Sequence, residues 1–206
     1  DEKNTSIKAL AYQLYENNGV LKRDQVSEYL KNLKQEDRKV LRDLGVKFGR
    51  YHIFLHRLIK PEPVSLRTLL WKNYNQKYFN LKPPTFGLNF LEDKEKNKNF
   101  MLLCGFEKFD NFFIRIDILE RLFMKIMSLS KEKNKEIKLI PEMLNLLGCG
   151  KEDFLKLIKK MNYTSFSKNE EIYFKYSPLK NNKKQFSPKV IKKENPFSVL
   201  KNINFK

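Results

Sequence analysis

The chain has 206 residues, of which 42 are Lys or Arg and 24 are Asp or Glu, so its formal net charge is +18. A hydrophobic fraction of 41% with 17 Phe is typical of a folded chain and excludes an intrinsically disordered one. A positive excess of this size attracts polyanions, nucleic acid first and acidic membrane surfaces second. The chain is also rich in Lys, Asn, Ile and Phe throughout, so part of the charge reflects a compositional bias.

The sequence lacks several kinds of site and segment. Cys104 and Cys149 make neither a disulfide framework nor a zinc knuckle, and we expect two small buried thiols in a reduced, cytoplasmic protein. The sequence has no run of 18 apolar residues, so we expect no transmembrane helix. The chain begins with a polar segment that has neither Met nor a signal-peptide pattern, from which we expect it to start within a longer protein.

Apolar residues at helical spacing predict three helices in the first part of the chain, at 7–19, 24–33 and 35–45. From Val46 to Leu55 the apolar residues alternate instead, which indicates a strand or an extended turn. Pro61 and Pro63 interrupt the pattern before a further helix at about Val64–Tyr74. That helix carries four apolar residues at helical spacing, Leu66, Leu69, Leu70 and Tyr74.

A segment without regular spacing follows, in which Pro83, Pro84 and Gly87 precede a charged run. Because a charged run without apolar spacing does not pack into a core, we expect a linker at 93–99. This linker separates a helical lobe at 1–92 from a second lobe at 100–178. The predicted fold is therefore mainly α with small β elements, in the α+β class.

The second lobe has the element order of a winged helix. A strand-like stretch leads to a helix that begins near Asp117, two helices flank a Gly-Cys-Gly turn at 148–150, and a hairpin is expected around 168–171. The helix after the turn presents four lysines opposite its apolar stripe, Lys151, Lys156, Lys159 and Lys160. In helix-turn-helix proteins this helix contacts nucleic acid, so these lysines are candidate phosphate ligands. The alternative is a structural or protein-binding winged helix whose lysines are only solvated.

The end of the chain is strongly basic. From Lys175 to Lys206 it has nine lysines against one acidic residue, Glu194. A basic tail at 179–206, with Lys180, Lys183 and Lys184 as candidate ligands, is typical of an arm that binds nucleic acid. The tail closes with a short segment that we expect to dock on the protein through Phe197, Leu200 and Ile203.

No constellation of catalytic residues is visible. The sequence has no phosphate-binding loop of the form GxxxxGK followed by Ser or Thr, and no Ser or Cys has a convincing His partner. His52 and His56 are the only histidines, and on a strand they would share one face about 13 Å apart. Two ligands alone make no closed metal site, so we expect neither a catalytic centre nor a metal centre in this chain.

Six segments form a collinear pattern over most of the chain: LGVKFG at 44–49, LIKP at 58–61, LRTLLW at 66–71, CGFEKFDNFFIRIDILERL at 104–122, LLGCGKEDFLKLIKKMNY at 146–163 and ENPFSVL at 194–200. This pattern resembles the C-terminal part of alphaproteobacterial ATP-dependent helicases, which are superfamily-two relatives of the mitochondrial degradosome RNA helicase. The resemblance implies a C-terminal accessory region outside the motor. It also implies that ATP and Mg²⁺ bind to a motor upstream and that no cofactor binds to this chain. No catalytic residue of the family has a counterpart here.

On this reading the segment from Leu41 to Trp71 belongs mostly to the core. Gly45 and Gly49 would allow a tight turn after a helix. The side chains expected to pack inward are Tyr51, Ile53 and Leu55. Arg50, Lys47 and Arg57 remain as surface residues that would reach a phosphate backbone.

The residues and the resemblance together predict a nucleic-acid-binding accessory region of a helicase, non-catalytic by itself. Lys and Arg would pair with phosphates, and aromatic side chains such as Tyr163, Phe166 or Tyr173 would stack on bases. The expected partners are single-stranded RNA or DNA and the motor domains of the same polypeptide, without a membrane. The alternative is a protein-interaction module that docks the helicase on a partner such as a nuclease, with its charge largely a compositional bias.

Overall fold

The computed structural model describes residues 3–92, 97–132 and 136–178. Within these residues the chain is mainly helical and has three small antiparallel sheets, so the predicted α+β class is confirmed. The predicted basic tail, with Lys180, Lys183 and Lys184, lies outside the described residues. None of the helices that are described is long and apolar enough to cross a membrane.

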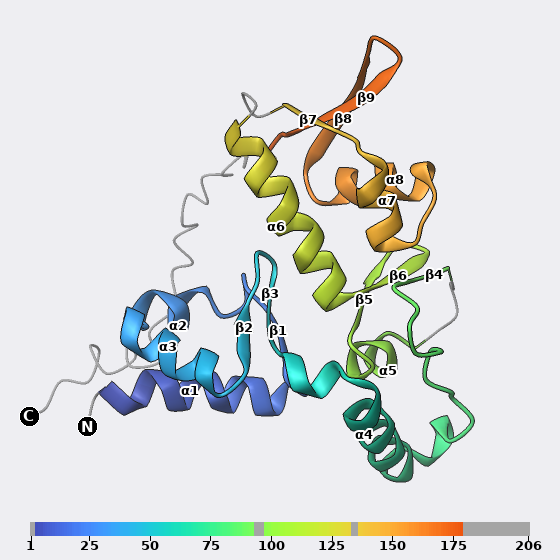
Figure 1. Cartoon of the computed structure of the whole chain (residues 1–206). Coiled ribbons are helices and arrows are strands. Elements are labelled where there is room, and N and C mark those ends of the chain that lie inside the picture. The colour runs from blue at the N-terminus through green and yellow to red at the C-terminus, as the bar shows by residue number, and fades with distance from the viewer. Residues whose placement is uncertain (1–2, 93–96, 133–135, 179–206) are drawn as a thin grey trace, which may run out of the picture.

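Residues 3–55 form three helices and a three-stranded sheet (Figure 1). In chain order the elements are α1 (Lys3–Glu16), β1 (Val20–Lys22), α2 (Ser27–Asn32), α3 (Gln35–Asp43), β2 (Val46–Phe48) and β3 (His52–Leu55). The three helices confirm the predicted ones, and the alternating segment is the hairpin β2–β3. Gly45, with a φ of 94°, takes a left-handed conformation between α3 and β2 that favours glycine. Strand β1 was not predicted, because three residues are too few for a periodic pattern.

Strand β3 lies in the middle of this first sheet, whose order is β1-β3-β2. Ile53 packs on one face with the core of α1, α2 and α3, and Phe54 packs on the other face with Ile116. The prediction that alternate residues point inward is therefore wrong in part. His52 and Phe54 are buried as well as Ile53, whereas Tyr51 is only half-buried. A middle strand that is covered on both faces has no solvent side to produce alternation.

Residues 56–115 contain two short 3-10 helices, two α-helices and the second sheet. The elements are η1 (His56–Ile59), α4 (Pro61–Tyr74), η2 (Gln76–Tyr78), β4 (Phe90–Glu92), α5 (Lys98–Leu103), β5 (Phe106–Phe109) and β6 (Phe112–Arg115). Pro61 begins α4 instead of interrupting the chain, because a proline at the first helical position loses no intrahelical hydrogen bond.

Helix α4 is buried on a different face from the one that its leucines mark. Val64 and Thr68 are the buried residues. More than half of each apolar side chain on the other face is exposed, at Leu66, Leu69, Leu70 and Tyr74. We call these four residues the α4 apolar face.

Contacts cross the predicted linker at 93–99. Strand β4 precedes the linker but pairs with β6, which follows it, in a sheet of order β4-β6-β5. Helix α5 begins at Lys98, within the predicted linker, and Asn97 caps it by accepting the backbone N–H groups of Asn99 and Phe100. The expected lobes at 1–92 and 100–178 therefore share hydrogen bonds, and the position of the division stays a prediction.

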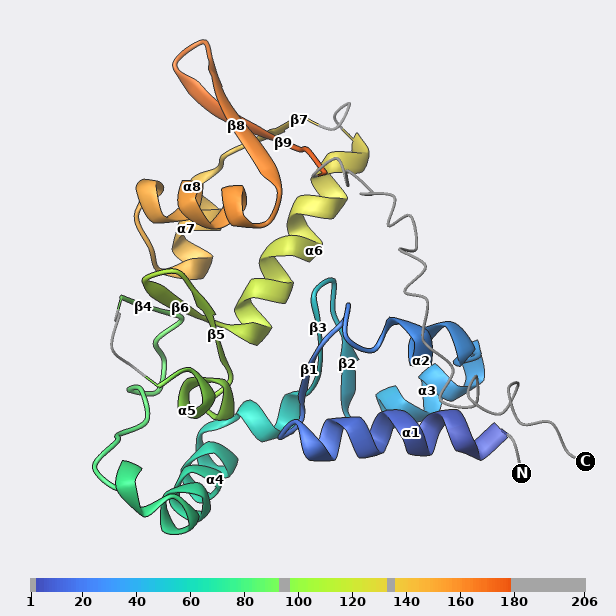
Figure 2. The ribbon, with the colours of Figure 1, turned by 180° about the vertical axis from the view of Figure 1, so that it is seen from behind.

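Residues 116–178 contain the two helices around the Gly-Cys-Gly turn and the hairpin that the sequence predicts. The elements are α6 (Ile116–Glu132), β7 (Glu136–Lys138), α7 (Pro141–Leu147), α8 (Lys151–Lys160), β8 (Tyr163–Lys168) and β9 (Glu171–Tyr176). In both views the tip of the β8–β9 hairpin projects from the body (Figures 1 and 2). The element order agrees with the winged-helix prediction, which stays an interpretation.

Helix α6 brings the N-terminal and C-terminal parts together. One of its faces packs with α7 and α8, where Phe154, Leu157 and Ile158 form the predicted buried stripe of α8. Its first half also contacts the turn between β2 and β3, where Tyr51 packs edge-on against Phe123 with ring centroids 4.7 Å apart. The β2–β3 turn therefore lies where several parts of the fold meet.

Candidate functional site

A cleft of about 470 Å³ opens beside the β2–β3 turn. Four parts of the chain border it: the end of β1 with the loop after it, the β2–β3 turn, the end of β5 and the end of α8. The lining residues are Lys22, Arg23, Asp24, Ser27, Arg50, Tyr51, His52, Glu107, Phe109 and Met161. We call this hollow the basic cleft.

Glu120 of α6 holds the β2–β3 turn in place. Its buried carboxylate accepts the backbone N–H of Tyr51 at 2.9 Å and that of His52 at 2.7 Å, and it also accepts the N–H of Arg50. One oxygen of the same carboxylate lies 3.0 Å from Nδ1 of His52. Three successive N–H groups on one carboxylate fix the backbone of the turn, so the side chains that leave it start from a rigid support. We call this arrangement the Glu120 clasp.

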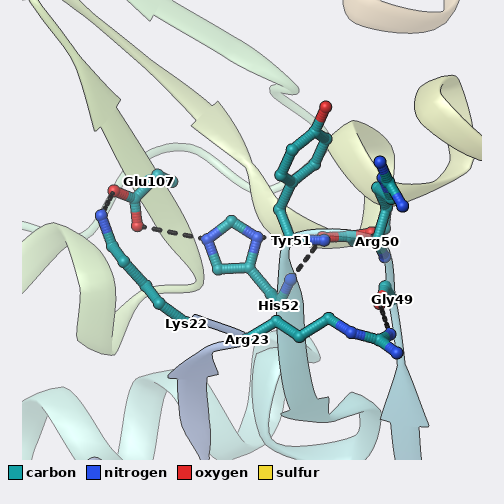
Figure 3. A network of polar contacts seen from close by, with 8 residues as sticks. Lys22, Arg23, Gly49, Arg50, Tyr51, His52 and Glu107 are labelled. Carbon is teal, nitrogen blue, oxygen red and sulfur yellow. Dashed lines mark hydrogen bonds and ion pairs between the residues drawn. The ribbon is translucent and has the colours of Figure 1, made fainter. Parts of the chain in front are cut away.

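His52 bridges two buried carboxylates (Figure 3). Its Nε2 lies 3.4 Å from Glu107, whose other oxygen accepts a hydrogen bond from Lys22 at 2.6 Å. Burial by itself would lower the pKa of His52, but Glu107 and Glu120 outweigh burial and raise that pKa above 6.5. Burial would likewise raise the pKa of Glu107, but His52 and Lys22 hold it below its usual value. At pH 6.5 the imidazole ring of His52 is therefore mostly protonated, and it lies between the side chains of Glu107 and Glu120.

Position 49 requires a glycine because the carboxylate of Glu120 lies close to its backbone. A Cβ atom at this position would lie 2.3 Å from the carboxyl carbon of Glu120, so any side chain here would displace the carboxylate. The C=O of Gly49 accepts a hydrogen bond from Nη1 of Arg23 at 2.7 Å, which ties the loop after β1 to the turn (Figure 3). The sequence predicted a glycine for a tight turn, whereas the structure shows that close approach of a side chain is the reason.

Arg50 and Tyr51 extend from the turn and line the basic cleft. Figure 3 shows both side chains pointing away from the ring of His52. Arg50 is exposed, and its guanidinium carbon lies 6.0 Å from the centroid of the Tyr51 ring. Burial raises the pKa of Tyr51, so its hydroxyl group stays protonated at physiological pH and can donate a hydrogen bond. Arg50 is thus a predicted ligand that the structure places in a cleft.

The remaining walls supply apolar surface and uncompensated charge. Phe109 at the end of β5 and Met161 after α8 line the cleft. In the part of the chain that the structure describes, neither Arg23 nor Arg50 has a carboxylate within ion-pair distance. Guanidinium groups beside aromatic surface suit an anionic ligand that also has an aromatic part.

The four lysines predicted on α8 are all exposed, and two of them are paired. Lys156 lies 2.8 Å from Asp153, and Lys160 lies 2.9 Å from Asp110. The other two of these four, Lys151 and Lys159, have no carboxylate within ion-pair distance among residues 3–92, 97–132 and 136–178. Exposed ion pairs of this kind contribute little, so a phosphate group can replace the carboxylate.

One of these pairs marks the rim of the basic cleft. Asp110 directly follows Phe109, and Lys160 directly precedes Met161, and both of the apolar residues line the cleft. The structure therefore brings Lys160 of the C-terminal part close to the cleft that holds Arg50. This proximity joins two sets of residues that the sequence predicted separately.

Other predicted residues lie elsewhere. Arg57 is exposed on η1 and does not line the basic cleft. Tyr163 was expected to be available for base stacking, but it is only 8% exposed and packs against Phe174 in the core, so that expectation is wrong. Phe166 and Tyr173 stack on each other across the projecting hairpin, with ring centroids 6.0 Å apart.

The geometry of the polar network favours a binding role. Both ring nitrogens of His52 face carboxylates, so neither is available to move a proton on a ligand. Among the residues described, no group of three His, Cys, Asp or Glu side chains could hold a metal ion. The network positions the turn, and the lining residues outside the network are Arg23, Asp24, Ser27, Arg50, Tyr51, Phe109 and Met161.

Sequence reasoning did not identify the Glu120 clasp, although one signal was present. Glu120 lies four residues after Ile116 and three before Phe123, both fully buried, so it occupies the buried face of an amphipathic helix. A carboxylate in such a position needs a partner. Its partner His52 could not be inferred, because nothing in the two segments indicates that they meet.

Comparison with known proteins identifies no family, since no family model, no curated protein and no solved structure matches this chain. The resemblance to helicase C-terminal regions therefore rests on the six collinear segments alone.

Proposed function

We propose that the chain is a nucleic-acid-binding accessory region that holds a single strand of RNA or DNA for an ATP-dependent helicase motor of the same polypeptide. It binds without catalysing a reaction of its own, and we expect it in the cytoplasm. The observation that carries the proposal is that exposed basic side chains from two parts of the chain lie together at the basic cleft. Arg50 lines the basic cleft, Lys160 lies at its rim, and the other α8 lysines are exposed on the same helix, which also carries Glu152 and Asp153. The six collinear segments support the helicase part of the proposal.

The charge of the chain predicts how it binds. Lysines that contact phosphates release condensed counterions, so the logarithm of the affinity falls with the logarithm of the salt concentration by about 0.7 per contact on a single strand. Binding of this kind has little sequence preference, because phosphates carry no sequence information. A chain with a net charge of +18 and aromatic side chains near its cations fits that mode.

The test replaces three α8 lysines together by Ala, at Lys156, Lys159 and Lys160. None of these residues belongs to the buried stripe of α8, so the fold should survive. Binding of a fluorescent oligonucleotide is measured by anisotropy over a range of salt concentrations. We expect lower affinity and a salt slope that is flatter by up to about two units.

The matched control removes the same charge from the N-terminal helices, with Ala at Lys8, Lys31 and Lys39. These lysines are exposed on α1, α2 and α3, which lie at the opposite end of the molecule from α8 in both views (Figures 1 and 2). If both triple variants weaken binding equally, net charge alone explains the effect and α8 has no special role. If the unaltered chain shows no salt-sensitive binding, the proposal fails.

A second candidate function is protein docking, in which the chain joins a helicase to a partner such as a nuclease. The α4 apolar face favours it, because helix α4 presents four large apolar side chains to solvent on one side. If the unaltered chain does not bind the oligonucleotide, protein docking remains as the proposed function. Its own test is loss of association with the partner when Leu66 and Leu70 are replaced by Ser.

A further inference from the structure

We propose that the basic cleft binds one nucleotide unit of a single strand, with the phosphate at Arg23 and Arg50 and the base against Phe109 and Met161. The inference rests on the proposed function and deepens it, because it assigns the place where one nucleotide is held. The sequence singled out only one of these four residues, Arg50.

The charges of the cleft select an anion. Two acidic residues line it, Asp24 and Glu107. Lys22 and His52 pair with Glu107, and Arg23 and Arg50 outnumber Asp24, so a positive excess remains. Arg23 uses Nη1 to bind the C=O of Gly49, which leaves its other N–H groups for a ligand. A guanidinium group is planar and binds two phosphate oxygens at once, so two neighbouring arginines form a suitable phosphate site.

The apolar walls and the size of the cleft select the rest of the ligand. Its volume of about 470 Å³ lies in the range of small-molecule sites and exceeds what a phosphate alone would fill. Half-buried Phe109, which stacks on Phe112, supplies the aromatic surface of the wall, and the mostly buried Met161 contributes a polarisable side chain beneath it. A base stacks on such surfaces whatever its identity, in agreement with binding that has little sequence preference.

The Glu120 clasp makes the site rigid before a ligand arrives. Glu120 holds the backbone N–H groups of Arg50, Tyr51 and His52, and Arg23 is tied to the same turn through Gly49. The backbone that carries the arginines therefore loses little freedom on binding, and this pre-organisation improves affinity.

The surroundings of the cleft favour a strand over a free nucleotide. Lys160 lies at the rim, where its surface pair with Asp110 can open to admit a phosphate. Lys156 and Lys159 are exposed on the same helix, and Lys156 is held in a surface pair with Asp153 that can open in the same way. A single nucleotide fills the cleft and leaves these cations unused, whereas a strand places its next phosphates on them.

The first experiment locates the base by photo-crosslinking. The probe is a ten-nucleotide oligouridylate with one 5-iodouridine, irradiated with the unaltered chain and analysed by mass spectrometry after digestion. Iodouracil crosslinks to aromatic side chains that it stacks on, so we expect the modified peptide to contain Phe109. Crosslinks confined to other segments would overturn the inference.

The second experiment compares two exposed arginines of equal charge. Arg50→Gln removes a cleft residue, and Arg57→Gln removes an arginine on η1 outside the cleft. We expect Arg50→Gln to weaken oligouridylate binding about three- to tenfold and to flatten the salt slope by about 0.7, with little effect from Arg57→Gln. A third variant, Phe109→Leu, keeps an apolar side chain but removes the aromatic face, and we expect about tenfold weaker binding.

Thermal unfolding of each variant shows whether its fold is intact, and the crosslink on the unaltered chain tests the site even if a variant does not fold. Equal effects of Arg50→Gln and Arg57→Gln, with salt-sensitive binding retained, would refute the cleft and leave the proposed function standing. Absence of any binding by the unaltered chain would refute both. Uridine monophosphate serves as the competitor, and displacement of the strand by an equal concentration of it would refute the strand assignment in favour of a free nucleotide.

Discussion

The Glu120 clasp predicts that a single carboxylate, far from the N-terminal sheet in sequence, controls the stability of the whole chain. Replacing Glu120 by Ala removes the acceptor of three backbone N–H groups and one of the two anions beside His52. The N–H of His52 is fully buried, so water cannot take the place of the carboxylate there. The N–H groups of Arg50 and Tyr51 are only partly buried and can bind water instead.

The magnitude follows from these contacts. A buried N–H left without a partner costs about 1–3 kcal/mol, and breaking a buried ion pair costs about 3–5 kcal/mol. Because His52 keeps Glu107 as a second partner, we take the lower end of both ranges and expect a total loss of about 4 kcal/mol. This is a large part of the roughly 5–15 kcal/mol by which domains are stable. The corresponding decrease in Tm is about 8–16 °C for a chain of this size.

The assay is urea unfolding followed by far-ultraviolet circular dichroism and by the fluorescence of Trp71, the only tryptophan. Glu120→Gln keeps one acceptor oxygen and the volume, so it should lose about half as much free energy of unfolding. Glu142→Gln is the control, since Glu142 is an exposed carboxylate of α7 paired with Lys125, and it should leave the Tm unchanged.

Gly49 provides an independent check of the same reasoning. Gly49→Ala should destabilise the chain because its Cβ would collide with the carboxylate of Glu120. In the Glu120→Ala background that collision disappears, so the two losses should not add. A loss below about 1 kcal/mol for Glu120→Ala, or full additivity in the double variant, would refute the clasp as the link between the two parts.

Two further predictions concern pH and proteolysis. The pKa of His52 is raised in the folded chain, so the stability that protonated His52 contributes is complete below pH 6.5 and is lost as the pH rises through the folded pKa. The pKa of Glu107 is lowered in the folded chain, so the stability that ionised Glu107 contributes is lost on acidification. The free energy of unfolding of the unaltered chain should therefore fall as the pH rises above 6.5 through the folded pKa of His52, and that of His52→Gln should fall less. Equal slopes in the two proteins would contradict the assignment. Limited proteolysis should cut the chain first in the charged run at 93–99, as detected by mass spectrometry, and the fragments should elute together on gel filtration because β4 pairs with β6. Early cuts elsewhere in the described body, or fragments that separate, would show that this prediction is wrong.

The sequence alone was sufficient for most of the helices and for the class of the fold. Helices α1, α3 and α8 have regular apolar spacing with acidic, basic or glycine residues at their ends, and these are local signals that do not depend on the rest of the chain. The Gly-Cys-Gly turn and the β8–β9 hairpin were likewise predicted from local turn chemistry. The positive charge of α8 could also be read directly, because a lysine opposite a buried stripe has to face solvent.

The tertiary structure decided which faces are buried and where the candidate site lies. Helix α4 buries Val64 and Thr68 and exposes its leucines, and β3 is covered on both faces, because burial depends on neighbours that come from elsewhere in the chain. The basic cleft likewise requires β1, the β2–β3 turn, β5 and α8 to meet. The periodicity of apolar residues describes one helix or strand at a time. Glu120 and His52 lie far apart in sequence, and only the packing of the whole chain brings them into contact.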